Sequence, residues 1–151
     1  MLRDEINAAL RAAMKARDQQ RVDALRLVNS AIQNADIEAS GQGKAALSDA
    51  EILALLQKLI RQRQESADIY EKSGRAELAA KERAEIEIIS AYLPKPMSDL
   101  EAGAAIAAIV REINAQGMKD MGRVMAALKE RFAGRLDFAK ASAKVKELLK
   151  S

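Results

Sequence analysis

The chain has 151 residues, enough to bury a hydrophobic core without disulfide bonds or metal ions. It contains no cysteine and no histidine, which excludes Cys/His zinc sites and the Ser-His and Cys-His catalytic pairs. The net charge of +3 is unevenly distributed: residues 1–93 have 14 Lys and Arg against 15 Asp and Glu, and residues 94–151 have 11 against 7.

The composition favours helix over strand. Alanine is the commonest residue, threonine is absent and valine is sparse, so we expect an all-α protein. Asp4 and Glu5 precede any apolar run, unlike a secretory signal, and the most apolar stretch, Gly103–Val110, is far shorter than the roughly 20 residues that cross a bilayer. We therefore expect a soluble, cytoplasmic protein that does not contact a membrane.

The first two expected helices form an antiparallel pair. Apolar residues recur at spacings of three and four from Leu2 to Met14 and again from Val22 to Ala35, which is the periodicity of an amphipathic helix. Asp18 precedes the second series and is a suitable N-cap. The stretch Ala39–Leu47, "ASGQGKAAL", is expected to be a loop, and its "GQGK" lacks both the spacing and the preceding strand of a phosphate-binding loop.

Two further helices complete the N-terminal part. Ser48 and Glu51 have the spacing of a capping box and predict the start of the third helix, which Gly74 ends. The fourth helix begins at about Arg75, and the prolines of "YLPKPMS" stop it. We place an N-terminal helical subdomain of about four helices at 1–93 and a Pro-rich linker at 94–97.

The C-terminal part, residues 98–151, is expected to be a module of three helices. The first follows a second "SxxE" capping box at Ser98 and closes at Gly117. The second runs from about Asp120 to Phe132 and stops at Gly134, and Asp137 caps the third.

Charged residues of the N-terminal part have a simple structural interpretation. Opposite charges lie four residues apart at Glu77 and Lys81, Arg83 and Glu87, and Arg61 and Glu65, a spacing that predicts ion pairs on solvated helix surfaces. Contact of Arg61 and Arg63 with RNA or a protein partner remains an alternative.

The cations of the C-terminal part suggest a binding surface. Lys119–Lys150 contains nine Lys and Arg against four Asp and Glu, the electrostatic pattern expected for contact with phosphate backbones. A solubilising surface is the alternative. Phe132 and Phe138 could stack on bases, but both fall on apolar stripes and are better explained as core residues.

Gly122 is unusual because glycine in the middle of a helix costs about 1 kcal/mol relative to alanine. In the first turn it would let a phosphate group approach the backbone beside Lys119 and Arg123. Close packing of another helix is the alternative explanation.

Four segments occur in order along nearly the whole sequence: "LRLVNSAIQNADIE", "IRQRQES", "ERAEIEIISAYLP" and "KDMGRVMAALKERFAGRLD". In their order and spacing they together resemble the GatB/YqeY family, as a free-standing YqeY-type chain. The resemblance implies an all-helical fold of two parts. It also relates the chain to the C-terminal extension of the B subunit of tRNA-dependent amidotransferase, which converts Glu-tRNA(Gln) or Asp-tRNA(Asn) to the amide form.

In that enzyme the tail module engages the tRNA body, while phosphorylation and transamidation occur in a separate catalytic domain for which this chain has no room. The sequence departs from the family pattern at Phe138-Ala139, where many relatives carry Gly-Lys. The resemblance therefore implies a tRNA-binding or amidotransferase-associated accessory protein.

Two other functions remain open: a protein-interaction module that docks on an enzyme through helix faces, and a carbon-nitrogen ligase with glutamine as amido-N-donor. We expect no catalytic residue, metal or cofactor. We expect the partners to be tRNA, an aminoacyl-tRNA synthetase or amidotransferase components. The candidate RNA contacts are Lys119, Gly122, Arg123, Lys129, Arg131, Arg135, Lys140 and Lys144.

Overall fold

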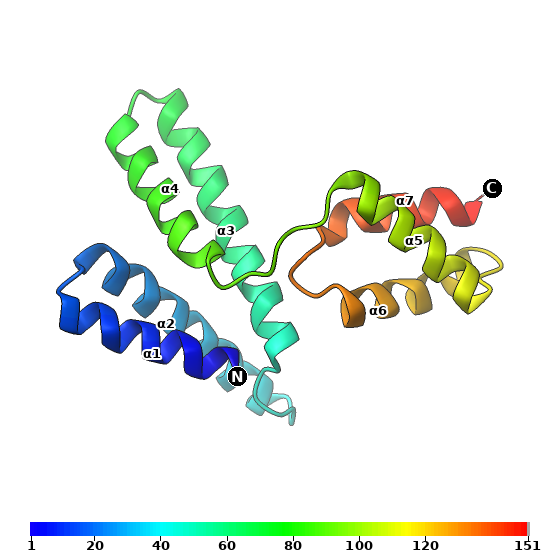
Figure 1. Cartoon of the computed structure of the whole chain (residues 1–151), viewed down its shortest axis with the longest axis horizontal. Coiled ribbons are helices and arrows are strands. Elements are labelled where there is room, and N and C mark those ends of the chain that lie inside the picture. The colour runs from blue at the N-terminus through cyan, green and yellow to red at the C-terminus, as the bar shows by residue number, and fades with distance from the viewer. Residues whose placement is uncertain (151) are drawn as a thin grey trace. The chain divides into compact units, whose positions relative to one another are not determined.

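The computed structural model describes residues 1–150, and this range contains seven α-helices, one 3₁₀ turn and no strand (Figure 1). The all-α prediction is confirmed. In chain order the elements are α1 Leu2–Ala16, α2 Gln19–Gly41, α3 Asp49–Lys72, α4 Ala76–Ser90, α5 Asp99–Ile113, the 3₁₀ turn η1 Met118–Asp120, α6 Met121–Arg131 and α7 Phe138–Lys150.

The chain divides into two compact units, the first spanning Met1–Leu93 and the second beginning at Pro94. Each unit has its own hydrophobic core, one built by α1 to α4 and the other by α5 to α7. Whether the two units act as separate functional domains stays a prediction.

The first unit consists of two helical hairpins, α1 with α2 and α3 with α4 (Figure 1). Asp18 accepts a bond from the Arg21 amide at 3.2 Å, which confirms it as the N-cap of α2. The helix α2 continues to Gly41, so it includes the first residues of the expected loop. The fully buried large side chains of this unit are Ile6, Leu25, Val28, Ile52, Leu56 and Ile89.

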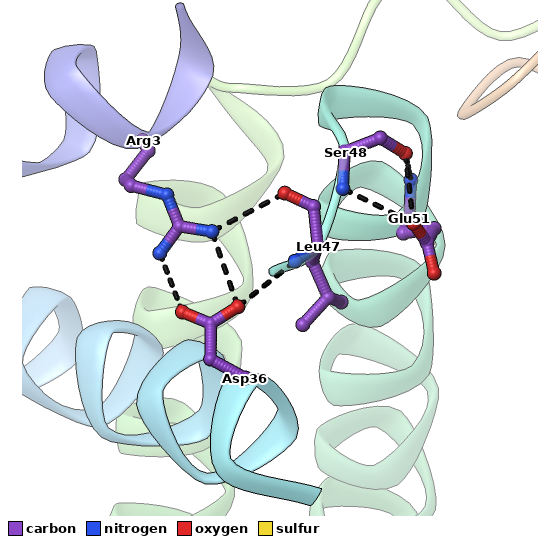
Figure 2. Close-up of polar contacts among 5 residues, drawn as sticks. All are labelled: Arg3, Asp36, Leu47, Ser48 and Glu51. Atoms are coloured by element: carbon purple, nitrogen blue, oxygen red, sulfur yellow. Dashed lines mark hydrogen bonds and ion pairs between the residues drawn. The ribbon is translucent and has the colours of Figure 1, made fainter. Parts of the chain in front are cut away.

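A polar network joins three helix ends of the first unit (Figure 2). The Arg3 guanidinium of α1 donates to both carboxylate oxygens of Asp36 in α2, at 2.6 and 3.2 Å, and to the Leu47 carbonyl at 3.2 Å. Asp36 also accepts the Leu47 amide at 2.9 Å, and the Ser48 and Glu51 capping box then starts α3. This network fixes the loop between α2 and α3 against α1.

Charged side chains connect α3 and α4, and the predictions for this surface were partly wrong. Arg63 lies at 12% side-chain exposure and pairs with Glu85 of α4 at 3.1 Å, so it is not a solvated surface cation. Arg83 pairs with Glu71 at 2.9 Å, across the hairpin. Within residues 1–150 none of the three predicted four-residue pairs is an ion pair, and Arg83 instead has partners on the facing helix α3.

The second unit begins with the predicted capping box, in which Ser98 and Glu101 bond reciprocally. The prediction that Gly117 closes this helix was wrong: α5 ends at Ile113, and Asn114 takes the left-handed conformation with φ 59°. Asparagine tolerates this conformation better than most residues, so it can replace glycine at a helix C-terminus.

The helix α6 starts one residue later than predicted, after the short 3₁₀ turn, and ends at Arg131. Gly134 follows with φ 77°, a conformation that glycine adopts without strain, so it turns the chain as expected. Asp137 accepts the amides of Ala139 and Lys140 at 3.0 and 3.3 Å, which confirms it as the cap of α7. The resulting core consists of Ile106, Ile109, Val124, Leu128, Leu136, Ala141, Val145 and Leu149.

Candidate nucleic-acid interface

The eight candidate RNA contacts all lie in the second unit, but they do not form one patch. Lys119, Gly122, Arg123 and Lys129 are exposed on η1 and α6, and we call these four residues the α6 face. A second group lines a hollow between the first turns of α5 and α7 and consists of Arg135, Lys140 and Lys144. Arg131 belongs to neither group.

Gly122 is the second residue of α6 and is exposed. Within the described part of the second unit, a methyl group in place of its hydrogen would meet no atom within 4 Å outside its own turn, so the alternative of close packing by another helix of this unit is wrong. Lys129 lies two helical turns further on the same side, about 10 Å along the axis. The exposed Ala126 and the partly buried Met125 lie between them, so no charged side chain separates Gly122 from Lys129 on this side of the helix.

Asp120 holds Arg123 at the start of α6. Asp120 is 8% exposed. Its carboxylate accepts hydrogen bonds from the Gln116 amide at 2.8 Å and from the Arg123 guanidinium at 3.2 Å. Both hydrogen bonds lower the pKa of Asp120, and the bond from Gln116 has the larger effect. The carboxylate makes no bond to the first amides of α6 itself. Arg123 therefore has a defined position while its side chain stays 62% exposed.

The remaining cations of η1 and α6 differ in whether a carboxylate neutralises their charge. Lys119 and Lys129 are exposed, and among the described residues no carboxylate lies within 4 Å of either ammonium group. Arg131 instead pairs with Glu112 of α5 at 2.6 Å. Arg131 is thus partly neutralised, whereas both lysines are available to an anionic ligand.

The second group depends on contacts that span the unit. The Arg135 Nε donates to the Lys95 carbonyl at 2.9 Å, and the Arg135 carbonyl accepts the Met97 amide at 2.9 Å. Lys144 donates from Nζ to the Asp99 carbonyl at 3.4 Å. These cations could be identified from the sequence, but the hollow could not, because it forms between segments about forty residues apart.

Phe132 and Phe138 are partly buried and pack against the core of the second unit, which agrees with their assignment to the apolar stripes. Within the described residues no helix is both long enough and apolar enough to cross a membrane.

The sequence model of a family described as "Yqey-like protein" matches residues 3–149. Curated relatives named "Altered inheritance of mitochondria protein 41, mitochondrial" include one from Lachancea thermotolerans, 35% identical over 69% of this chain and 55% of its own length. Those from Saccharomyces cerevisiae and Vanderwaltozyma polyspora are 34% and 33% identical over 56% of this chain and 44% of theirs. The chain spans about half the length of these relatives, and its own cytoplasmic location stays a prediction.

Proposed function

The chain belongs to the YqeY-like protein family, and from that premise we propose that it is an accessory protein that binds RNA through the α6 face, with tRNA as the ligand. The observation that carries the proposal is the exposed, unobstructed Gly122 with Lys119, Arg123 and Lys129 around it. A phosphate group can approach the backbone there, at the positive end of a helix.

Binding on this surface would be electrostatic. Lys119 and Lys129 would contact phosphate groups as mobile point charges, while Arg123, fixed by Asp120, offers a planar guanidinium with donors in a set orientation. Such contacts position a nucleic acid without reading its bases. The proposal therefore predicts affinity for folded RNA with little dependence on base sequence.

The three cations of the hollow lie in a different setting. Asp99 and Asp137 line the same hollow, and both carboxylates would repel an entering phosphodiester chain. We therefore assign Arg135, Lys140 and Lys144 to a separate surface rather than to the RNA interface.

A titration of purified tRNA at several salt concentrations tests the proposal. Each phosphate contact contributes about 0.7 to 0.9 to the slope of log affinity against log salt, so the double variant Lys119→Gln, Lys129→Gln should reduce that slope by about 1.4 to 1.8. Lys146→Gln on α7 is the matched control, because Lys146 is an exposed lysine outside the α6 face. A wild-type affinity that does not depend on salt, or equal slopes for all three proteins, would rule out the proposal.

Two alternative functions remain, and the second has a direct assay. Docking on an enzyme as a protein-interaction module is favoured by the hollow between α5 and α7. Catalysis as a glutamine-dependent carbon-nitrogen ligase requires that the purified chain alone transamidate misacylated tRNA when glutamine and ATP are supplied. Product formation by the chain alone would replace the accessory role with an enzymatic one.

A further inference from the structure

The hollow between α5 and α7 has an apolar floor. Its volume is about 530 Å³, within the size range of ligand-binding clefts. Ile106, Leu136 and Ala141 form the base and are at most 4% exposed, and Met97 and Ala102 are partly buried beside them. A floor of this kind favours aliphatic groups.

A second hollow of about 260 Å³ continues the first along the same two helices, because Ile106 and Lys144 line both. Gly103 and Ala107 of α5 keep it open, and Leu148 of α7 lines it at 45% exposure. We call the two hollows together the α5–α7 trough.

An exposed leucine lies on the α5 side of the trough. Leu100 is 85% exposed and lies seven residues before Ala107, hence on the same side of α5. Large apolar side chains beside a concave surface are typical of protein-binding sites. The trough therefore offers apolar contact both on its floor and along its edge.

Positive charge converges on the first hollow. Arg135 and Lys144 donate to backbone carbonyls, and within residues 1–150 no carboxylate lies within 4 Å of the charged nitrogens of either residue or of Lys140. The first turns of α5 and α7 both line the hollow, so the positive ends of two helix dipoles add to these cations. A carboxylate on an occupant would offset this charge.

The acidic groups of the trough narrow the class of occupant. Asp137 is engaged in capping α7, Asp99 lies in the first turn of α5, and Glu147 lines the second hollow. A polyanion such as RNA would meet all three carboxylates, and none of the described residues that line either hollow is an aromatic residue that could stack on a base. A peptide can instead place one carboxylate by the cations and aliphatic side chains on the floor.

We propose that the α5–α7 trough binds an amphipathic segment of a partner protein that carries an acidic side chain beside aliphatic ones. The segment lays its apolar side on Ile106 and Leu136, and its carboxylate meets Lys140 and Lys144. This mode corresponds to a helix in a groove, in which aliphatic anchors give affinity and flanking charges give orientation.

Peptides selected from a random display library on the full-length chain provide the probe. Selection should enrich sequences that combine Asp or Glu with Leu, Ile or Met at helical spacing. Fluorescence anisotropy with the enriched peptides then measures their affinity for variants of the chain. Peptides without such a motif, or no enrichment at all, would overturn the proposal.

Two matched pairs of variants localise the binding. Ala143→Leu fills the first hollow from an exposed position of α7, and Ala126→Leu makes the same change on the exposed side of α6. We expect the first to weaken peptide binding about tenfold and the second to leave it unchanged. Lys140→Glu should weaken binding about fivefold, whereas Lys129→Glu should not. Equal effects within either pair would overturn the proposal.

Occupation of the trough by tRNA or by a second copy of the chain would give different experimental results. If tRNA binding falls more with Lys140→Glu than with Lys129→Glu, the trough is an RNA site and both proposals are overturned as stated. If sedimentation shows self-association that Ala143→Leu abolishes, a second copy of the chain occupies the trough, which also overturns this one. Failure of tRNA binding alone leaves the peptide result unaffected, because the two surfaces are probed by different variants.

Discussion

Replacing Gly122 by alanine should stabilise the second unit. Outside its own helical turn the added methyl group meets no atom of the described residues within 4 Å, and the backbone of Gly122 lies outside the left-handed region that strains other residues. Alanine is favoured over glycine by about 1 kcal/mol inside a helix, and the position in the first turn reduces the gain to about 0.5 kcal/mol. For a unit of this size the midpoint of thermal unfolding should rise by roughly 2 to 4 °C.

Gly134→Ala is the matched control, since Gly134 is buried and has φ 77°. A side chain in this conformation costs about 1 to 2 kcal/mol, so the control should be destabilised. Unfolding is followed by circular dichroism, and the methyl signals of Val124 and Leu128 report the second unit specifically. A loss of stability in Gly122→Ala comparable to that of the control would refute the open-surface interpretation of Gly122.

The same Gly122→Ala variant separates structure from binding. If a phosphate group contacts the backbone at this position, the methyl group obstructs it, and tRNA affinity should fall although the protein is more stable. Unchanged affinity would show that the α6 face binds RNA only through its side chains, or not at all.

Three further predictions concern stability. The hydrogen bond from Arg3 lowers the pKa of Asp36. The contribution of this pair to stability is therefore present above the ordinary carboxyl pKa and is lost as pH falls through the lowered value. Asp36→Asn should flatten the loss of thermal stability below about pH 4. Leu128→Ala should cost about 2 to 5 kcal/mol in denaturant titrations, and Leu100→Ala, at an exposed position, less than about 0.5 kcal/mol. Glu85→Gln, which breaks the α3–α4 ion pair, should cost about 1 to 3 kcal/mol, and no loss would show that water replaces the pair.

Helix positions could be predicted from the sequence because their signals are local. A capping box predicts the start of a helix from four consecutive residues. The sequence has one at Ser48–Glu51 and one at Ser98–Glu101, and the structure has both. The end of α5 was missed because Asn114 competes with Gly117 for the same role, and both tolerate positive φ.

Ion-pair partners and the surroundings of individual residues depend on tertiary contacts, which the sequence pattern of a single helix does not specify. The spacing of Arg83 and Glu87 suggests a pair within α4, but Arg83 reaches α3 instead, and spacing along one helix contains no information on a facing helix. Likewise the sequence around Gly122 does not indicate whether another helix or solvent covers this residue. The cations of Arg135 and Lys144 were identified from charge, yet their separation from the α6 face required the packing of α5 on α7.

The most direct measurement is a titration of the isotopically labelled full-length chain with tRNA, followed by NMR of the backbone amides. The proposed function predicts that the largest shifts lie in residues 119–130 and that they diminish as salt is raised. The amides of Ala102 and Ala143 in the trough should be unaffected. Shifts confined to the trough, or none at a tRNA concentration that saturates binding, would contradict the account.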